Sequence, residues 1–248
     1  MIYSKKLKTL TLCASASAIL LAGQSALAHT TLSKNTIQEG VRVYNSAQIG
    51  HGCGDNSVIA NSIVFPDGVD SIIRSRGQII VGKTVDDFLT GYGNQVRMVK
   101  SKDIFTQSAE KFDSLKNRVG FHSWDGELGP TDLGLVNLRT DAFTINEESC
   151  AKSVKLKLAI ADICVADENM PYDPTEVNLW TPAVEGSNYN GDPAGHGYNS
   201  PATLTITRVS PLPAACGEGF KVNIIPSGAQ INRDMPIPGF WSLAPAAQ

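Results

Sequence analysis

The chain has 248 residues, of which 42% are hydrophobic and 18% charged, and its formal net charge is −3. This composition excludes a disordered chain, because the apolar content is too high and the charge too low. The small acidic excess excludes a typical nucleic-acid-binding protein. No apolar run reaches the roughly 20 residues of a membrane-spanning helix.

The first 28 residues predict a secretory signal peptide. A basic start, Met1–Lys8, precedes a short apolar stretch at 9–23, and Ala26-Leu27-Ala28 forms a cleavage site of the A-x-A type. The alternative is a retained membrane anchor, but glycine and serine interrupt this stretch. Cleavage after Ala28 leaves 220 residues with four cysteines and changes the net charge from −3 to −6. The chain is then expected in the periplasm or outside the cell.

Short apolar or alternating runs, separated by Gly/Pro turns, predict that the remainder is all-β. These runs are residues 41–44, 62–65, 78–81, 134–138, 154–163 and 203–209. Many short strands with such punctuation are typical of a β-sandwich or a barrel. Asp103–Arg118 mixes charges with apolar residues and fits either a helix or a solvated loop.

No linker divides the mature chain, so residues 29–248 are predicted to form a single domain. Residues 165–201 are rich in Asn, Gly, Pro, Asp and Tyr and are expected to form long inserted loops. Residues 210–248 are expected to wrap the domain as irregular chain.

His29 is the most informative residue, because the predicted cleavage makes it the N-terminus. A free α-amine and an imidazole on one residue can chelate a metal ion together. An all-nitrogen clip suits Cu(II) best among the divalent first-row metals. The amine must lose its proton, so binding would depend on pH. The alternative is that cleavage leaves a histidine in a frayed terminus.

An ordered set of motifs follows this residue: His29-Thr30-Thr31-Leu32, Glu39-Gly40, His51-Gly52-Cys53 and Ile63-Val64-Phe65-Pro66-Asp67-Gly68. The set resembles the YcnI-like family of secreted copper-binding domains. That family opens its mature chain with His-x-Thr-Leu, and many members carry His-Gly-Cys and a strand ending in Pro-Glu-Gly. Later motifs are also similar, namely Ser123-Trp124-Asp125-Gly126, Cys164 and Trp180-Thr181-Pro182.

The resemblance implies an immunoglobulin-like β-sandwich that binds Cu(II) through the N-terminal histidine, with a carboxylate and a tryptophan close by. By this comparison His29 is the chelating residue and Trp180 the aromatic neighbour. The sequence departs from the family at Ser33, where a glutamate is common, and at Glu39, where alanine precedes the glycine. Glu39 is the candidate carboxylate. The implied partners are a copper ion and a copper-transport membrane protein or chaperone.

Three further histidines, His51, His122 and His196, could each offer a neutral nitrogen near pH 7. His122 and His196 lie in turn-rich segments where binding residues often occur, although a surface or hydrogen-bonded role explains either of them. Packing around a neighbouring disulfide accounts for His51.

The four mature cysteines, Cys53, Cys150, Cys164 and Cys216, are expected to pair as disulfides in an oxidising compartment. Four cysteines allow three connectivities. The resemblance favours Cys53–Cys164, which leaves Cys150–Cys216. The methionines are few and scattered, so a thioether Cu(I) site is not indicated.

No hydrolase or phosphate-loop motif is present in the sequence. The sequence therefore favours a non-enzymatic Cu(II) protein that serves copper trafficking or homeostasis. One alternative is a metal-free sandwich that binds a partner through its surface. The other is a copper-dependent oxidative enzyme in which His122 or His196 supplies a second imidazole.

Overall fold

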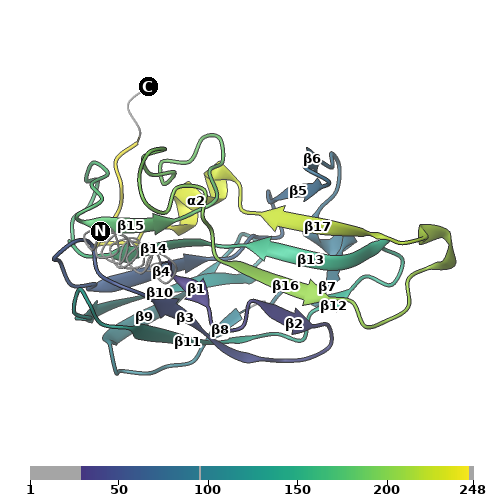
Figure 1. Cartoon of the computed structure of the whole chain (residues 1–248), viewed down its shortest axis with the longest axis horizontal. Coiled ribbons are helices and arrows are strands. Elements are labelled where there is room, and N and C mark those ends of the chain that lie inside the picture. The colour runs from purple at the N-terminus through teal and green to yellow at the C-terminus, as the bar shows by residue number, and fades with distance from the viewer. Residues whose placement is uncertain (1–28, 95, 246–248) are drawn as a thin grey trace, which may run out of the picture.

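The computed structural model describes residues 29–94 and 96–245, so the predicted signal peptide lies outside the described residues. Strands in layered sheets make up most of the regular secondary structure of this chain (Figure 1). One short helix, α2 (Gly228–Asp234), and two 3-10 turns, η1 (Val85–Asp87) and η2 (Ala214–Cys216), complete the regular structure of the described part. The predicted all-β sandwich class is confirmed.

A five-stranded antiparallel sheet forms the middle of the molecule, in the order β15-β14-β4-β10-β9. Its strands are β4 (Ala60–Val64), β9 (Phe105–Phe112), β10 (Arg118–Gly126), β14 (Ala159–Ile163) and β15 (Val177–Trp180). Every residue of β4 and β14 is buried, because both faces of this central sheet are covered. A strand covered on both sides does not alternate between buried and exposed residues, and the buried polar residues Asn61, Ser62 and Asp162 of these strands form hydrogen bonds.

A six-stranded sheet has the order β2-β16-β13-β17-β5-β6. Its strands are β2 (Thr36–Gln38), β5 (Ile72–Ser75), β6 (Gln78–Ile79), β13 (Ala151–Lys157), β16 (Thr203–Thr207) and β17 (Phe220–Ile225). The pairs β2–β16 and β13–β17 are parallel, and the others are antiparallel. Val154 and Leu156 of β13 are fully buried, while Lys155 and Lys157, which alternate with them, point outward, as expected for a sheet with one face exposed to solvent.

Two smaller sheets complete the layers. One has the order β1-β3-β11-β8, and the other pairs β7 with β12. Their strands are β1 (Thr31–Leu32), β3 (Tyr44–Ile49), β7 (Leu89–Thr90), β8 (Val96–Met98), β11 (Gly134–Thr140) and β12 (Thr144–Ile145). The edge strand β1 begins two residues after His29 and pairs with β3, with Thr31 opposite Gln48.

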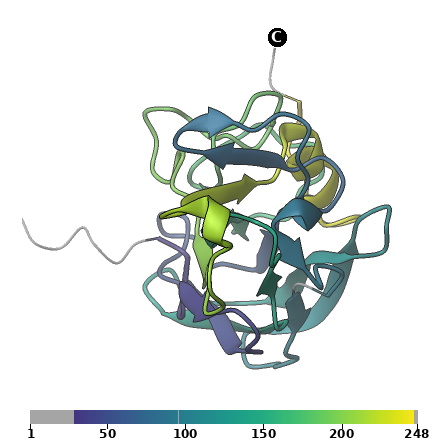
Figure 2. The ribbon, with the colours of Figure 1, turned by 90° about the vertical axis from the view of Figure 1, so that its right-hand side faces the viewer.

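The core consists of two apolar clusters, one on each face of the central sheet. The first lies between the sheets and includes Ile63, Phe121 and Leu156. The second is formed where α2 and the chain after it cover the other face, with Ile231 and Trp241 packed on β4 and β14. Viewed end-on, this C-terminal segment lies along one side of the strands (Figure 2).

The structure corrects three expectations for individual segments. Asp103–Arg118 is neither helix nor loop, since it contains the edge strand β9, whose pairing with β10 outweighs a weak local preference. The run 154–163 is two strands in different sheets, β13 and β14, separated at Leu158. Residues 210–248 are not merely irregular, because β17 and α2 lie within them.

Candidate metal centre

The candidate site is built around the indole of Trp180, the last residue of β15. This side chain is 1% exposed, and its Nε1 donates a hydrogen bond of 2.6 Å to Oδ2 of Asp162 on the neighbouring strand β14. The same oxygen accepts from the hydroxyl of Thr30 at 2.6 Å, and Oδ1 accepts from Asn61 at 2.7 Å. One buried carboxylate therefore fixes the tryptophan and the first residues after His29 together.

Asp162 is fully buried, and burial raises the pKa of its carboxyl group. The hydrogen bonds from Thr30, Trp180 and Asn61 oppose that rise only in part. All three donors point at the carboxylate, so its oxygens are already engaged. Asp162 orients the groups around it, and the exposed surface of the site is formed by other residues.

Three imidazole rings surround the indole. The ring centroid of His29 lies 4.8 Å from that of Trp180, that of His196 lies 4.7 Å away, and that of His51 lies 6.0 Å away. His196 lies between the other two histidines, 5.4 Å from His29 and 5.3 Å from His51. We call His29, His51, His196 and Trp180 the histidine cluster. The three histidines come from the start of the described chain, the loop after β3 and the loop after β15.

One ring nitrogen of His51 is hydrogen-bonded, and the other has no hydrogen-bond partner among the described residues. Its Nδ1 lies in hydrogen-bond contact with the carbonyl of Gly52, which also accepts from Asn178 at 2.9 Å. A donating Nδ1–H leaves Nε2 as the basic nitrogen, and Nε2 is buried without a hydrogen-bond partner among the described residues. A carbonyl that orients the far nitrogen of an imidazole is the usual support for a metal-binding histidine.

Two glycines allow the loops to approach this closely. A Cβ on Gly52 would lie 2.1 Å from the carbonyl oxygen of Asn56, so no larger residue fits beside His51. Gly197 has φ of +86°, and a Cβ there would lie 2.3 Å from the carbonyl oxygen of Leu179 and 3.0 Å from Cε3 of Trp180. Only glycine combines that backbone conformation with that contact. Both glycines directly follow a histidine of the cluster.

The electrostatics of the cluster favour the neutral form of His196. Partial burial, followed by the charges of His51 and His29, lowers the pKa of His196. A metal ligand must be the unprotonated ring, so this environment favours the form that binds metal.

Imidazole nitrogens are common metal ligands, but the spacing of the side chains in this structure is not that of a metal site. Across residues 29–94 and 96–245, no group of three or more His, Cys, Asp or Glu side chains has the spacing needed to hold a metal. In the intact chain the nitrogen of His29 is part of a peptide bond. The predicted cleavage after Ala28 would make this nitrogen an amine.

The sequence-predicted carboxylate has a different set of partners. Oε1 of Glu39 accepts hydrogen bonds from the amides of Val209 and Ser210, each at 2.7 Å, and Oε2 accepts from the amide of Ile145 at 2.9 Å. Burial would raise the pKa of Glu39, but these bonds together lower it. Glu39 thus ties β2 to the chain after β16, and no contact joins it to the histidine cluster within the described residues.

His122 lies outside the histidine cluster. It is on β10, 9% exposed, with its ring 5.1 Å from that of Trp124. Burial and the charge of Lys111 lower its pKa to about 4. Of the two histidines considered as a second imidazole, the structure brings His196 to His29 and leaves His122 elsewhere.

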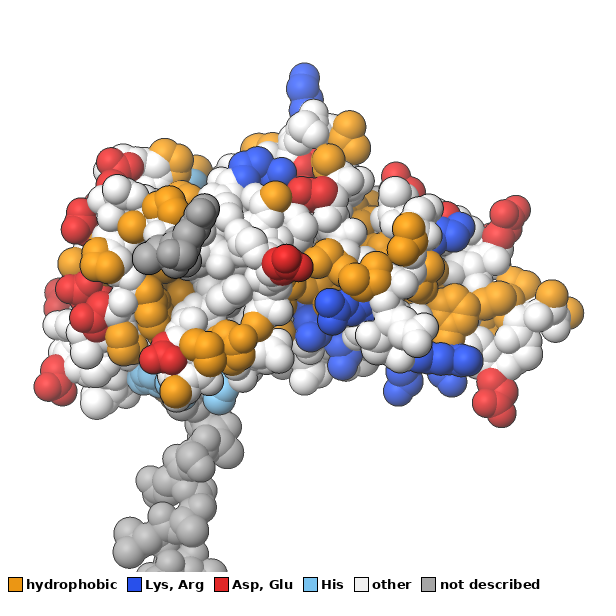
Figure 3. Space-filling view, turned by 90° about the horizontal axis from the view of Figure 1, so that it is seen from above, with side chains coloured by type: hydrophobic (Ala, Val, Ile, Leu, Met, Phe, Trp, Pro, Cys, Tyr) orange, Lys and Arg blue, Asp and Glu red, His pale blue; other side chains and the backbone are white. Residues whose placement is uncertain are grey.

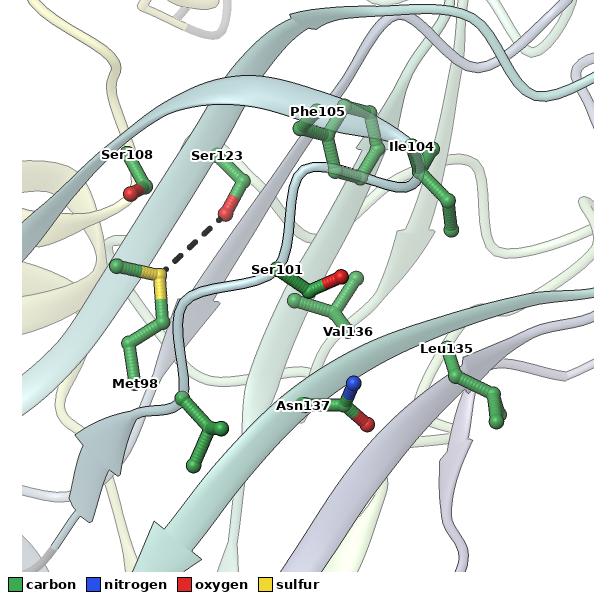
Figure 4. A pocket seen from close by; sticks show the side chains of 10 residues that line it. Met98, Ser101, Ile104, Phe105, Ser108, Ser123, Leu135, Val136 and Asn137 are labelled. Carbon is green, nitrogen blue, oxygen red and sulfur yellow. Dashed lines mark hydrogen bonds between the residues drawn. The ribbon is translucent and has the colours of Figure 1, made fainter.

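A pocket of about 410 Å³ opens beside His29. Ile49 is among its lining residues, with Leu133 and Leu135 on the exposed side. A second pocket, between β8, β9 and β11, is far smaller at about 20 Å³ (Figure 4). Its lining residues carry no charge, and Ser123 donates to the sulfur of Met98 within it. Of the four residues of the histidine cluster, His29 is the one that lines the larger pocket.

Sequence reasoning found His29 and Trp180, which the structure brings together, but it missed Asp162. A signal was present, since Asp162 is the one acidic residue of the otherwise apolar strand Ala159–Ile163. An acid in a strand buried on both sides requires donors, and such a residue commonly organises a site.

Comparison with known proteins gives neighbours in fold only. No family model matches the chain, and no curated protein matches it. An uncharacterised protein from Nocardia farcinica with an immunoglobulin-like fold is similar over 72% of this chain and 98% of its own, with 9% identity and a TM-score of 0.39. A type II cohesin domain from the cellulosome of Acetivibrio cellulolyticus is similar over 71% of this chain and 92% of its own, with 13% identity and a TM-score of 0.29.

The β-sandwich class rests on the strands and sheet order of this chain itself. Cys53 is bonded to Cys164 and Cys150 to Cys216, which confirms both predicted disulfides. Two disulfides are typical of a protein that folds in an oxidising compartment, as a secreted protein does. No helix in the described part of the chain is long and apolar enough to cross a membrane.

Proposed function

We propose that the chain beginning at His29 is a secreted or periplasmic protein that binds one Cu(II) ion, and that it serves copper trafficking or homeostasis. The observation that carries this proposal is the histidine cluster, in which three imidazoles surround one buried indole at the predicted new N-terminus. Copper is the cargo of this protein, and no turnover is required.

His29 supplies the first two donors, its amine and its imidazole. Its position is fixed one residue later, where the hydroxyl of Thr30 donates to Asp162. His196 and His51 are the further nitrogen donors closest to it, and Nε2 of His51 is free to bind. A site made of nitrogen donors favours Cu(II) over Zn(II) and over the hard cations, which prefer oxygen.

The indole has a separate role. Trp180 is held by Asp162 and packs against His29 and His196, so it limits the rotation of both rings. Acidic side chains gather at the end of the molecule where histidine reaches the surface (Figure 3). Their negative potential attracts a cation to this end.

The decisive experiment is isothermal titration of Cu(II) into protein that begins at His29, together with EPR at one equivalent of copper. We expect one tight site with nitrogen couplings from the amine and from imidazole. A single glycine added before His29 should weaken binding by about 100-fold or more, since it converts the amine into an amide. Unchanged affinity in this extended protein would refute the proposal.

Histidine variants test the ligand set. His196→Gln and His51→Gln should each lower Cu(II) affinity and remove an imidazole coupling from the EPR spectrum. His122→Gln is the matched control, because it removes the remaining mature histidine from outside the cluster. Equal losses for His122→Gln and His196→Gln would contradict the assignment.

One observation also supports a copper-dependent oxidative enzyme, namely the imidazole of His196 at 5.4 Å from that of His29. Two imidazoles and an amine could form a three-nitrogen copper site. Peroxide-dependent oxidation of chitin or cellulose by the copper-loaded protein would establish this second candidate. Copper binding without oxidation products supports the trafficking role.

A further inference from the structure

The outward face of the six-stranded sheet carries an unusual row of side chains. The strand register aligns Arg74 with Asn223, Asn223 with Lys155, and Lys155 with Thr205. Because paired residues point to the same side of a sheet, these side chains form one line across four strands, about 14 Å long. The line continues at one end to Thr36 and at the other to Ile79.

Further basic residues adjoin this line. Lys157 lies two residues along β13 from Lys155 and points to the same face. Beyond Asn223, Lys221 lines a groove of about 450 Å³ with Arg76 and Lys152. We call the six residues of this surface the basic face: Arg74, Arg76, Lys152, Lys155, Lys157 and Lys221.

Acidic side chains do not neutralise the basic face. None of its six members forms an ion pair or a side-chain hydrogen bond within residues 29–94 and 96–245. Nε of Arg74 is buried without a partner in the same part of the chain. Burial and the neighbouring charges of Arg74 and Lys155 lower the pKa of Lys157. Glu218, at the margin of the groove, is its one acidic lining residue.

Exposed aliphatic side chains accompany these cations. Ile79 lies directly beside Arg74 in the register and is 56% exposed, and Val81 is 90% exposed. A soluble polyanion offers nothing for such side chains to bury against. A lipid surface offers anionic headgroups for the cations and an apolar layer just beneath for the aliphatic side chains.

We propose that the basic face, with Ile79 and Val81, is a docking surface for an anionic lipid membrane. The face is a local feature, since the chain as a whole is acidic. Binding therefore depends on the orientation of the molecule and is sensitive to salt. The acidic end that carries histidine is repelled by the same membrane, which orients the candidate copper site away from it (Figure 3).

The test is cosedimentation of the chain beginning at His29 with vesicles. We expect binding to vesicles of phosphatidylcholine mixed with phosphatidylglycerol at low salt, its loss at high salt, and no binding to phosphatidylcholine alone. The triple variant Arg74→Gln, Lys155→Gln, Lys157→Gln should weaken binding by about 100-fold, which is about fivefold for each of three cations. Absence of binding to the anionic vesicles overturns the proposal.

A charge-matched control comes from exposed lysines on other elements. Lys100→Gln, Lys102→Gln, Lys116→Gln changes the net charge by the same amount and should leave vesicle binding within about twofold. An equal loss in both triple variants would mean that net charge matters and the basic face does not. Near-ultraviolet circular dichroism checks that each variant keeps its tertiary packing.

The aliphatic residues distinguish a membrane from a soluble polyanion. Ile79→Ser, Val81→Ser should reduce binding to anionic vesicles while leaving any binding to heparin unchanged. If the double variant binds vesicles as well as the parent protein does, and heparin competes fully, the surface recognises polyanions and the membrane proposal is refuted.

Discussion

Replacing Trp180 by phenylalanine tests the hydrogen bond that organises the histidine cluster. Phenylalanine keeps an aromatic ring in the cavity but has no N–H to donate to Asp162. The lost bond is 2.6 Å long and joins side chains that are 1% and 0% exposed. A hydrogen bond to a charged group contributes about 1.5–3 kcal/mol.

The smaller ring also loses packing against His29 and His196. At about 0.8 kcal/mol per buried carbon, the two missing carbons contribute about 1.5 kcal/mol. We therefore expect Trp180→Phe to lower the free energy of unfolding by about 3–5 kcal/mol in urea denaturation. Trp124→Phe is the matched control, because Trp124 is partly exposed and its indole forms no such bond within the described residues. This control should lower the free energy of unfolding by about 1 kcal/mol.

A double-mutant cycle with Asp162→Asn isolates the bond itself. The coupling free energy between positions 162 and 180 should be about 1.5–3 kcal/mol. Additive effects, with a coupling below about 0.5 kcal/mol, would show that the indole is held by packing alone and would refute this reasoning. Copper titration of Trp180→Phe then reports how far the orientation of the imidazoles depends on the indole.

Three further predictions follow from the geometry. Gly197→Ala should lower the free energy of unfolding in urea by about 3 kcal/mol and weaken Cu(II) binding. Gly186→Ala is the control, because Gly186 has φ of +76° but open space where a Cβ would lie. This control should lower the free energy of unfolding by about 1 kcal/mol and leave Cu(II) binding unchanged. Glu39→Gln should lower the free energy of unfolding at pH 7 by about 2 kcal/mol, because the side-chain NH2 of glutamine would face the backbone N–H of Ile145. Since the folded pKa of Glu39 is lowered, its contribution is present above the usual carboxyl range and is lost as the pH falls, so urea curves of variant and parent should converge in acid. Replacing Cys150 and Cys216 by serine opens a disulfide of sequence separation 66 and should lower stability by about 4 kcal/mol, measured by thermal unfolding, without abolishing the copper site.

Sequence patterns predicted the sandwich class because strand alternation and turn residues are local signals. These local signals were strongest in β13, where outward-pointing lysines alternate with buried residues because one face of the sheet is exposed to solvent. They were weakest where tertiary packing decides, as in β9, which is stabilised by its pairing with β10. The role of the C-terminal segment depends on the apolar cluster that covers the central sheet, a long-range contact with no local signature.

The candidate site was predictable only in part. His29 and Trp180 could be named, since one follows a cleavage motif and the other belongs to the family resemblance. The convergence of His51 with His196 brings together loops that are far apart in sequence, and Asp162 accepts a hydrogen bond from Thr30, 132 positions away. Spacing along the chain does not show which distant loops come together, so the histidine cluster could be recognised only from the fold.

The position of strand β17 determines when the six-stranded sheet can form during synthesis of the chain. This strand lies between β13 and β5 in the six-stranded sheet, although it is the last strand of the described chain. Until residue 225 has been synthesised and exported, β13 and β5 each present an unpaired edge, and unpaired edges invite association between chains. Completion of this sheet must therefore wait for almost the entire polypeptide, and a protein truncated before β17 should accumulate as aggregate.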